Sequence, residues 1–377
     1  MEKRLMDAPV LFERLPTTNG RYLGHVRLNA LTTLNSLSLE MIDLIQAKID
    51  EWRDDNDIVA LFFDAEGDKA FSAGGDIQAL YHDMSANPGG PCTYCDAFFE
   101  REYRLDYQLR QYPKPTIAWG HGIVMGGGLG ILSACTYRIG TETTRIAMPE
   151  ITIGLFPDAG GTFTFSRMDP AFSHFIALTA ANINARDGLL TGMLSHLVQQ
   201  EQKEAVLHAL LNSDLDQANV STNLEEILLH HNGEAEDGFA PANLAVQEEA
   251  IRAAFEPALT AKYPIKALAE NMADWPEDKW LQRARASFLG GSPVTAQVIL
   301  EQFERAKTQS MAEMFRMELD IATACSVHGE FTEGVRALLI DKDGSPAWQY
   351  PLGEVPKSHV ERHFDPVATP HPLQDLA

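Results

Sequence analysis

Two glycine-rich turns, each lying between a β-rich run and a helical one, constrain this fold more than any other feature. A buried strand predicted at 58–67 leads into AGGD (73–76), and a strand predicted at 115–124 leads into GGG (126–128). A helix is expected after each turn, the first beginning at Ile77. The repeated order of strand, glycine turn and helix predicts a mixed α/β core.

Hydrophobic spacing along the rest of the chain indicates two regions. The stretches 21–29 and 137–150 have the composition of strands, and 38–55 carries apolar residues at helical spacing. From about residue 170 to 325 the signals are helical, and a turn-rich tail follows. We therefore expect an α/β core over residues 1–205 and a mostly helical region over 206–377.

Charge and composition narrow the classes of function. The chain has 30 Lys and Arg against 53 Asp and Glu, a net charge of -23, which disfavours binding to nucleic acid or to an anionic membrane. No apolar run reaches the ~18 residues of a membrane span. The opening residues mix charges of both signs and have the pattern of neither a signal nor a transit peptide. Four cysteines fit a reducing compartment. We expect a soluble, cytoplasmic protein.

The glycine turns can serve three purposes. They can simply permit tight turns, or they can present backbone N–H groups at helix starts, where no intrahelical carbonyl accepts them. Two such groups converging on one oxygen would form an oxyanion hole. A phosphate cradle is the third option, but the chain lacks the Gly-Lys-Ser/Thr of a P-loop. The dinucleotide pattern begun at Gly120 and Gly122 fails at Met125.

A third loop, MPEITIGLFPDAGG (148–161), holds two carboxylates eight residues apart, Glu150 and Asp158, among apolar residues. Each acid is either exposed or partly desolvated, and desolvation raises a carboxyl pKa. Two carboxylates in differing environments suit nucleophilic or acid/base catalysis.

Other candidates are weaker. Cys92 and Cys95 have CxxC spacing, but no second pair of ligands follows, so a zinc site is not expected. His121 lies at a strand end, where it is either catalytic or bonded to backbone. Ser133 and Asp76 lack the surrounding pattern of a hydrolytic nucleophile.

Taken together, five stretches resemble the crotonase (enoyl-CoA hydratase/isomerase) superfamily, and most closely its 3-hydroxyisobutyryl-CoA hydrolase branch. They span nearly the whole chain: KAFSAGGDI (69–77), FEREY (99–103), GHGIVMGGGLG (120–130), AMPEITIGLFPDAGG (147–161) and GEFTEGVRALLIDKDGSPAW (329–348).

The resemblance implies a spiral of β-β-α turns followed by helices that cover an acyl pocket. It implies an oxyanion hole at the backbone N–H groups of Gly75 and Gly127, which would polarise an acyl-CoA thioester carbonyl. Hydratases of the family have two glutamates, but the first of these positions is Gly130 here. Glu150 keeps the second, and Asp158 replaces a usual glycine, which is the hydrolase pattern.

The resemblance therefore implies hydrolysis of a small 3-hydroxyacyl-CoA, as in valine breakdown. Glu150 would attack the thioester or activate water, Asp158 would move a proton, and Glu102 would bind the substrate hydroxyl. Lys69 and Lys342 are candidates for binding the CoA phosphates. No metal or redox cofactor is expected, because CoA is part of the substrate.

Two other functions stay open. One is a different reaction of the family, such as hydration or isomerisation of a short enoyl-CoA, and the other is acyl-CoA binding without catalysis. A homo-oligomer is possible. The acyl pocket would depend on how Phe98, Phe99, Met125 and Phe156 pack.

Overall fold

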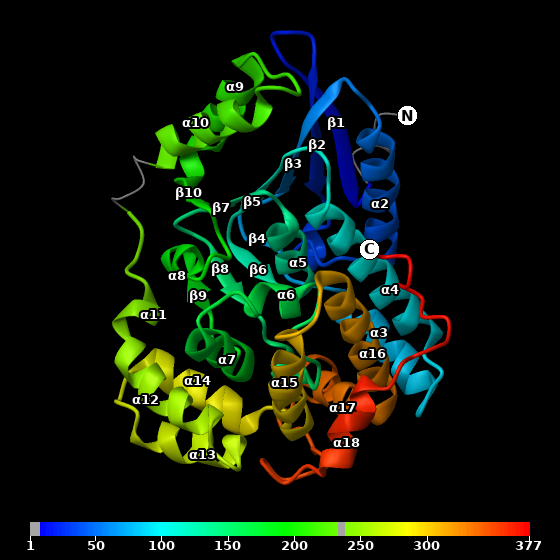
Figure 1. Cartoon of the computed structure of the whole chain (residues 1–377), viewed down its shortest axis with the longest axis vertical. Coiled ribbons are helices and arrows are strands. Elements are labelled where there is room, and N and C mark those ends of the chain that lie inside the picture. Colours follow the sequence, from blue (N-terminus) through cyan, green and yellow to red (C-terminus); the bar gives the residue numbers. More distant parts are fainter. Residues whose placement is uncertain (1–7, 233–237) are drawn as a thin grey trace. The chain divides into compact units, whose positions relative to one another are not determined.

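The computed structural model describes residues 8–232 and 238–377 (Figure 1). They form two compact units, each assembled from three separate segments of the chain. The first unit contains the residues up to Gly75, Leu105–Ile146 and Ile183–Asn243; the second contains Asp76–Arg104, Ala147–Asn182 and Leu244–Ala377. Local hydrophobic spacing in the sequence divides the chain into two continuous regions, 1–205 and 206–377. That division stays a prediction.

The first unit is built around a six-stranded sheet. Its two N-terminal strands are antiparallel, and the other neighbouring strands run parallel. The strand order is β1 (Val10–Pro16), β2 (Tyr22–Leu28), β3 (Ile58–Ala65), β5 (Thr116–Gly120), β7 (Tyr137–Gly140) and β10 (His196–Leu197).

A second sheet takes up the strands that follow. β3, β5 and β7 are each succeeded along the chain by a short strand of this other sheet, and a helix follows two of those short strands. Its order is β4 (Ala70–Ser72), β6 (Ile123–Met125), β8 (Arg145–Ala147) and β9 (Ile183–Asn184). This alternation between two sheets confirms the expected β-β-α spiral.

The prediction of one strand over 115–124 is wrong in one respect. This stretch forms two strands, β5 and β6, which belong to different sheets. The chain turns at Gly122, whose φ is +58°. A Cβ there would lie 2.3 Å from the carbonyl oxygen of Lys69, so only glycine fits this close approach. Alternating hydropathy does not detect such a turn, because both short strands are apolar.

Helices and an apolar core complete the first unit. Ser38 caps α2 (Leu39–Arg53) by accepting a hydrogen bond from the Met41 N–H. The remaining helices are α5 (Gly126–Ala134), α8 (Ala185–Leu190), α9 (Lys203–Asn212) and α10 (Val220–Asn232). Sheet residues such as Phe62 and Trp119 share one buried cluster with Leu210 and Leu224 of α9 and α10.

The second unit is almost entirely helical. Its core includes Phe175, whose ring meets those of Phe255, Trp275 and Trp280 at 5.1–6.1 Å. α4 (Thr93–Arg110) begins in this unit and ends in the first. The other helices are α3 (Ile77–Ala86), α6 (Gly161–Phe165), α7 (Pro170–Thr179), α11 (Asn243–Val246), α12 (Glu248–Leu259), α13 (Pro264–Asn271), α14 (Lys279–Gly290), α15 (Pro293–Ala306), α16 (Met311–His328), α17 (Glu330–Val335) and α18 (Lys357–Glu361).

Within residues 8–232 and 238–377, none of these helices is long and apolar enough to cross a bilayer.

Candidate active site

Glu150 opens a single 3₁₀ turn, Glu150–Ile153, that packs tightly against α17 in the second unit. The turn ends at Gly154, with φ of +77°, where a Cβ would lie 2.5 Å from the Glu330 carbonyl oxygen. On the opposite side, a Cβ on Gly334 would lie 2.4 Å from the Ile153 carbonyl. Two glycines thus let backbone meet backbone, which fixes the turn that carries Glu150.

Asp158 lies on the loop that follows this turn. The hydroxyl of Tyr103, on α4, donates a 2.7 Å hydrogen bond to Oδ2 of Asp158. The next two residues, Ala159 and Gly160, have φ of +52° and +76°. An alanine in the left-handed region is strained, so contacts elsewhere must hold the loop in this conformation.

Two buried side chains supply those contacts. Glu318, on α16, accepts 2.8 Å hydrogen bonds from the backbone N–H groups of Gly160 and Thr162, one on each carboxylate oxygen. Gln302, on α15, donates to the Pro157 carbonyl at 2.9 Å and to the Thr162 hydroxyl at 2.7 Å. The loop around Asp158 is therefore held from α4, α15 and α16 at once.

The two acids are buried and electrostatically linked. Glu150 is 5% exposed and Asp158 4%. Burial, and secondarily the charge of Asp158, raises the pKa of Glu150 well above its usual range. Burial also raises the pKa of Asp158, while the hydrogen bond from Tyr103 opposes that rise. Oε2 of Glu150 is buried and has no hydrogen-bond partner among the described residues. This arrangement suits proton transfer or nucleophilic attack near neutral pH.

Glu102 precedes Tyr103 on α4 and is 3% exposed, so it too is a buried carboxylate rather than part of a solvated helix face. Phe98, Phe99 and Phe156 are buried in the same unit, and the ring of Phe99 lies 5.7 Å from that of Tyr103. The second unit thus combines buried carboxylates with aromatic surroundings.

The glycine turns come together inside the first unit. β4 and β6 pair in parallel, so the turns that follow them begin at the same edge of one sheet. A Cβ on Gly74 would lie 3.5 Å from the Met125 carbonyl oxygen and 3.8 Å from Cα of Gly126. Gly75 directly follows Gly74 in the chain, and Gly127 directly follows Gly126. These are the two residues whose N–H groups are predicted to form the oxyanion hole. The two glycine turns therefore lie side by side, and their use as an oxyanion hole stays a prediction.

The start of α5 leaves the buried Gly127 N–H without a partner inside the helix. Gly127 is the second residue of the helix, so its N–H has no intrahelical acceptor, and Met125 at the cap position offers no side-chain bond. A Cβ on Gly128 would lie 2.5 Å from Cβ of Ser72 in β4, so this glycine allows the helix to pack closely on the strand.

The two lysines predicted to bind CoA are both exposed. Lys69 lies between β3 and β4 in the first unit, and Lys342 follows α17 in the second. In the described part of the chain, neither has an ion pair with a carboxylate. The acids on either side of Lys342, Asp341 and Asp343, are paired with Arg336 at 2.6 and 2.7 Å.

The weaker candidates lie in surroundings typical of structural residues. Burial raises the pKa of both Cys92 and Cys95, which makes these thiols poor nucleophiles. His121 donates from Nε2 to the Gly67 carbonyl at 2.7 Å. The Ser133 hydroxyl accepts from Arg110 at 2.7 Å and donates to the Gly130 carbonyl. Across residues 8–232 and 238–377, no group of three or more His, Cys, Asp or Glu is placed to hold a metal ion.

Sequence reasoning missed Tyr103, Glu318 and Gln302. Tyr103 lies inside the FEREY stretch, yet nothing in the local pattern distinguishes a tyrosine that binds Asp158 from one that fills a core. Glu318 and Gln302 lie 156 and 140 residues along the chain from Thr162, which both of them bind. The one available signal for Glu318 and Gln302 was a charged or amide residue on the apolar side of a helix. Such a signal does not indicate which residue the side chain binds.

Comparisons with known proteins agree on one family. A family model described as enoyl-CoA hydratase/isomerase matches residues 23–364. The mitochondrial 3-hydroxyisobutyryl-CoA hydrolase of Danio rerio is 33% identical over 94% of this chain and 89% of its own length. The human protein of the same name is 31% identical over 90% and 86%. A solved structure described as a carnitinyl-CoA dehydratase from Mycobacterium thermoresistibile superposes with a TM-score of 0.81 at 28% identity, covering 96% of this chain and 97% of that one.

Proposed function

This chain belongs to the enoyl-CoA hydratase/isomerase family, and from that premise we propose that it hydrolyses 3-hydroxyisobutyryl-CoA to 3-hydroxyisobutyrate and CoA. The observation that carries the proposal is the buried acid pair, Glu150 with its raised pKa and Asp158 bound by Tyr103. Relatives named as hydrolases of this thioester, similar over about nine-tenths of the chain, support the choice of substrate.

Hydration of an enoyl-CoA is the main alternative within the family, and the structural relative named as a dehydratase makes it a specific one. The position of the first hydratase glutamate is occupied by Gly130, inside buried α5. Without that first glutamate, addition of water across a double bond lacks half of its acid/base pair. This absence of a carboxyl on α5 favours the hydrolase.

In the proposed mechanism, the thioester oxygen accepts hydrogen bonds from the N–H groups of Gly75 and Gly127. The Glu150 carboxylate attacks the carbonyl carbon, and the C–S bond breaks as CoA leaves as a thiolate that takes up a proton. Water then adds to the resulting mixed anhydride, which releases the hydroxy acid and restores the Glu150 carboxylate. The raised pKa of Glu150 makes it a better nucleophile once ionised.

Asp158 receives the proton of the attacking water and passes it on, with its carboxyl held in place by the Tyr103 hydroxyl. Glu102 hydrogen-bonds the 3-hydroxyl of the substrate. In the general-base variant of the same scheme, Glu150 removes the proton from water and no anhydride forms. Both variants use the same residues and release the same thiol.

The binding of CoA is assigned to the exposed cations. Lys69 and Lys342 have no competing carboxylate among the described residues, so each can attract a CoA phosphate. We propose that the reaction uses no metal or redox cofactor, because each step is a proton transfer or an acyl transfer. A role in valine breakdown follows from the substrate. Cytoplasmic localisation is our expectation, while the vertebrate relatives are named mitochondrial. A homo-oligomer also stays a prediction.

The first experiment follows free thiol released from 3-hydroxyisobutyryl-CoA with a thiol-reactive dye, and in parallel the loss of the crotonyl-CoA double bond. Rapid thiol release without hydration is expected. Hydration without thiol release would overturn the proposal and reassign the acid/base roles. Binding of CoA without turnover of either thioester would support the non-catalytic alternative.

A further inference from the structure

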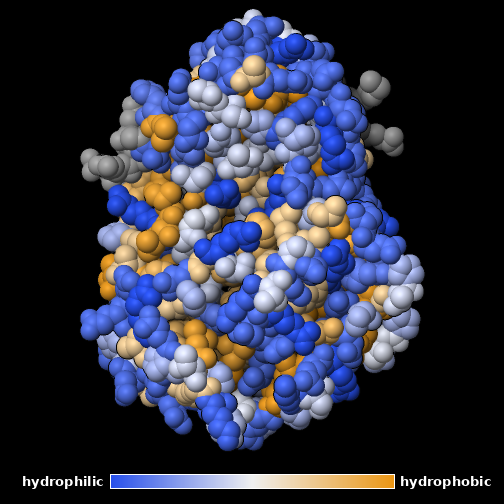
Figure 2. Space-filling model, viewed as in Figure 1, coloured by the Kyte–Doolittle hydropathy of each residue, from blue (hydrophilic) through white to orange (hydrophobic). Residues whose placement is uncertain are grey.

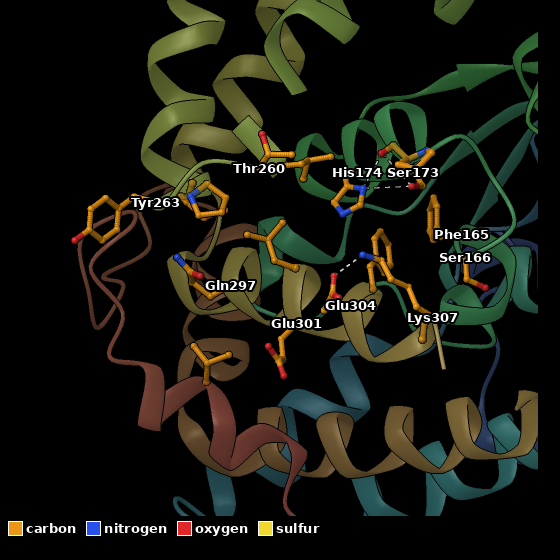
Figure 3. Close-up of a pocket in the computed structure, with 18 of the residues that line it drawn as sticks. Phe165, Ser166, Ser173, His174, Thr260, Tyr263, Gln297, Glu301, Glu304 and Lys307 are labelled. Carbon is orange, nitrogen blue, oxygen red and sulfur yellow. Dashed lines mark hydrogen bonds and ion pairs between the residues drawn. The ribbon is translucent and has the colours of Figure 1, made fainter. Parts of the chain in front are cut away.

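The second unit contains a cavity of about 1250 Å³ that the proposed reaction does not use (Figure 3). Its walls come from α6, α7, α13, α15 and α18, and neither Glu150 nor Asp158 lines it. Pockets that take small organic ligands usually have volumes of about 300–1,000 Å³, so this cavity has room for one. In Figure 2, apolar surface is visible among hydrophilic surface in the region where Figure 1 places α7, α13 and α15.

The inner wall of the cavity is apolar. Phe165, Ile265, Phe303 and Met314 are at most 6% exposed, so they form a buried lining of hydrocarbon and aromatic rings. The centroid of the Phe303 ring lies 5.6 Å from that of Phe165 and 5.0 Å from that of His174, and the His174 pair is T-shaped. Such a wall favours a ligand with a hydrocarbon body.

The rim is basic although the protein is strongly acidic. Only two carboxylates, Glu301 and Glu304, line the cavity, and one of them is paired with a lysine. The whole chain has 53 acidic against 30 basic residues, so the ratio is reversed here. Five cationic side chains line it: Arg167, Lys262, Lys266, Lys307 and Lys357.

Two of these cations are without a carboxylate partner. Lys307 pairs with Glu304 at 2.5 Å, as the dashed line in Figure 3 shows, and Lys266 pairs with Glu354 at 3.1 Å. By contrast, Arg167 and Lys262 make no ion pair within residues 8–232 and 238–377. Arg167 stacks on the ring of Phe163 and donates to its carbonyl, contacts that leave its positive charge uncompensated.

From this apolar wall and basic rim we propose that the cavity is a second ligand site, which binds a fatty carboxylate. The hydrocarbon chain lies against Phe165, Ile265 and Phe303, and the carboxylate is held at the rim by Arg167 and Lys262. An anionic head and an apolar body are both required, because the wall offers hydrocarbon and the rim offers unpaired positive charge.

Adjacent residues of α15 connect this site to the acid loop. Phe303 lines the cavity, while its neighbour Gln302 holds the Pro157 carbonyl and the Thr162 hydroxyl. Phe165, at the end of α6, lines the cavity from the same helix that contains Thr162. A ligand in the cavity therefore touches the two helices that support the loop bearing Asp158.

The test is a calorimetric titration of the purified full-length chain with dodecanoate. It measures binding and not thiol release, so its result does not depend on the proposed function. Saturable 1:1 binding with a micromolar Kd is expected. Dodecan-1-ol should bind at least ten-fold more weakly, because it lacks the charge. The double variant Arg167→Gln, Lys262→Gln should weaken dodecanoate binding at least ten-fold, and the matched control Lys279→Gln, an exposed lysine of the same unit outside the cavity, should not.

Leu300→Trp tests the wall separately, since Leu300 is a partly exposed lining residue and the larger indole ring fills space in the cavity. Loss of dodecanoate binding with an unchanged Tm is expected. Equal affinity in the double variant and the wild type would overturn the proposal. So would complete displacement of dodecanoate by saturating CoA, because that would place the fatty acid in the acyl-CoA site, or the absence of any saturable binding.

Discussion

The hydroxyl of Tyr103 lies 2.7 Å from Oδ2 of Asp158, and both side chains are almost completely buried, at 0% and 4% exposure. The hydrogen bond favours the ionised carboxylate, so it counteracts the rise in the Asp158 pKa that burial causes. In turn, burial and the nearby carboxylates raise the pKa of Tyr103 well above its usual range, which keeps the phenol protonated and able to donate.

Tyr103→Phe removes this hydrogen bond with little change in volume. The pKa of Asp158 should rise, and the acid limb of the kcat/KM profile that reports its ionisation should move to higher pH. A fall in kcat of about ten-fold is expected. Tyr112→Phe, which removes a partly buried hydroxyl that donates to the Ile49 carbonyl in the other unit, is the control and should leave the profile in place. An unshifted profile in Tyr103→Phe would contradict the assignment of Asp158.

Glu150→Gln should lower activity and raise stability together. The folded pKa of Glu150 is raised, so the ionised form destabilises the fold increasingly as pH rises above the unfolded value of about 4.3. At pH 7.5 the neutral amide should therefore increase Tm, while thiol release falls at least a hundred-fold. Calorimetry at pH 7.5 checks the first effect, and exposed Glu277→Gln is the control. Near-normal thiol release in Glu150→Gln would refute the proposed mechanism, and so would normal release in Asp158→Asn.

Glu318→Gln tests whether the acid loop is held from α16. An amide has only one acceptor oxygen, so either the Gly160 or the Thr162 N–H would face an amide donor and lose its partner. An unpaired buried N–H costs about 1–3 kcal/mol, which should appear as a lower Tm. As a positioning residue, Glu318 should affect kcat more than KM. An equal loss in exposed Glu270→Gln, or a change in KM alone, would show that the loop does not depend on this carboxylate.

Gly127→Pro tests the proposed oxyanion hole. Proline is tolerated in the first turn of a helix, where the missing N–H has no intrahelical partner. Gly127→Ala adds a Cβ but keeps the N–H, so it is the matched control. The rate of thiol release by the proline variant should be roughly 10²- to 10³-fold below that of the alanine variant. Similar rates for the two variants, with both folded by circular dichroism, would exclude this N–H as a donor to the substrate.

A histidine in the C-terminal part makes stability depend on pH. His363 is 2% exposed, and burial lowers its pKa to about 4 against an unfolded value of about 6.5. The unfolded chain therefore binds more protons between these values, and stability falls as pH falls from 6.5 to 4. This group should account for a loss of about 2 kcal/mol between pH 7 and pH 5. Urea unfolding should show a smaller loss in His363→Leu, and an identical pH dependence would contradict the buried neutral state.

The local sequence determined the elements and the chemistry that they carry. Runs of apolar residues and glycine turns predicted β3, the helices after 73–76 and 126–128, and the spiral core, because strand and helix periodicities and the need for a positive φ act over a few residues. The local sequence also identified Glu150 and Asp158. A carboxylate in an apolar loop is unusual, and it can be recognised without knowing which residues contact it in the fold.

Only the tertiary structure decided what surrounds those acids. Tyr103, Gln302 and Glu318 reach the loop from three helices far apart in the chain, and their roles depend on which side chains meet across the core. The split at Gly122 likewise depends on how closely the Lys69 carbonyl approaches. Burial and hydrogen bonding between distant residues set the pKa of a carboxyl group, so the sequence identified the acids while the fold determined their protonation.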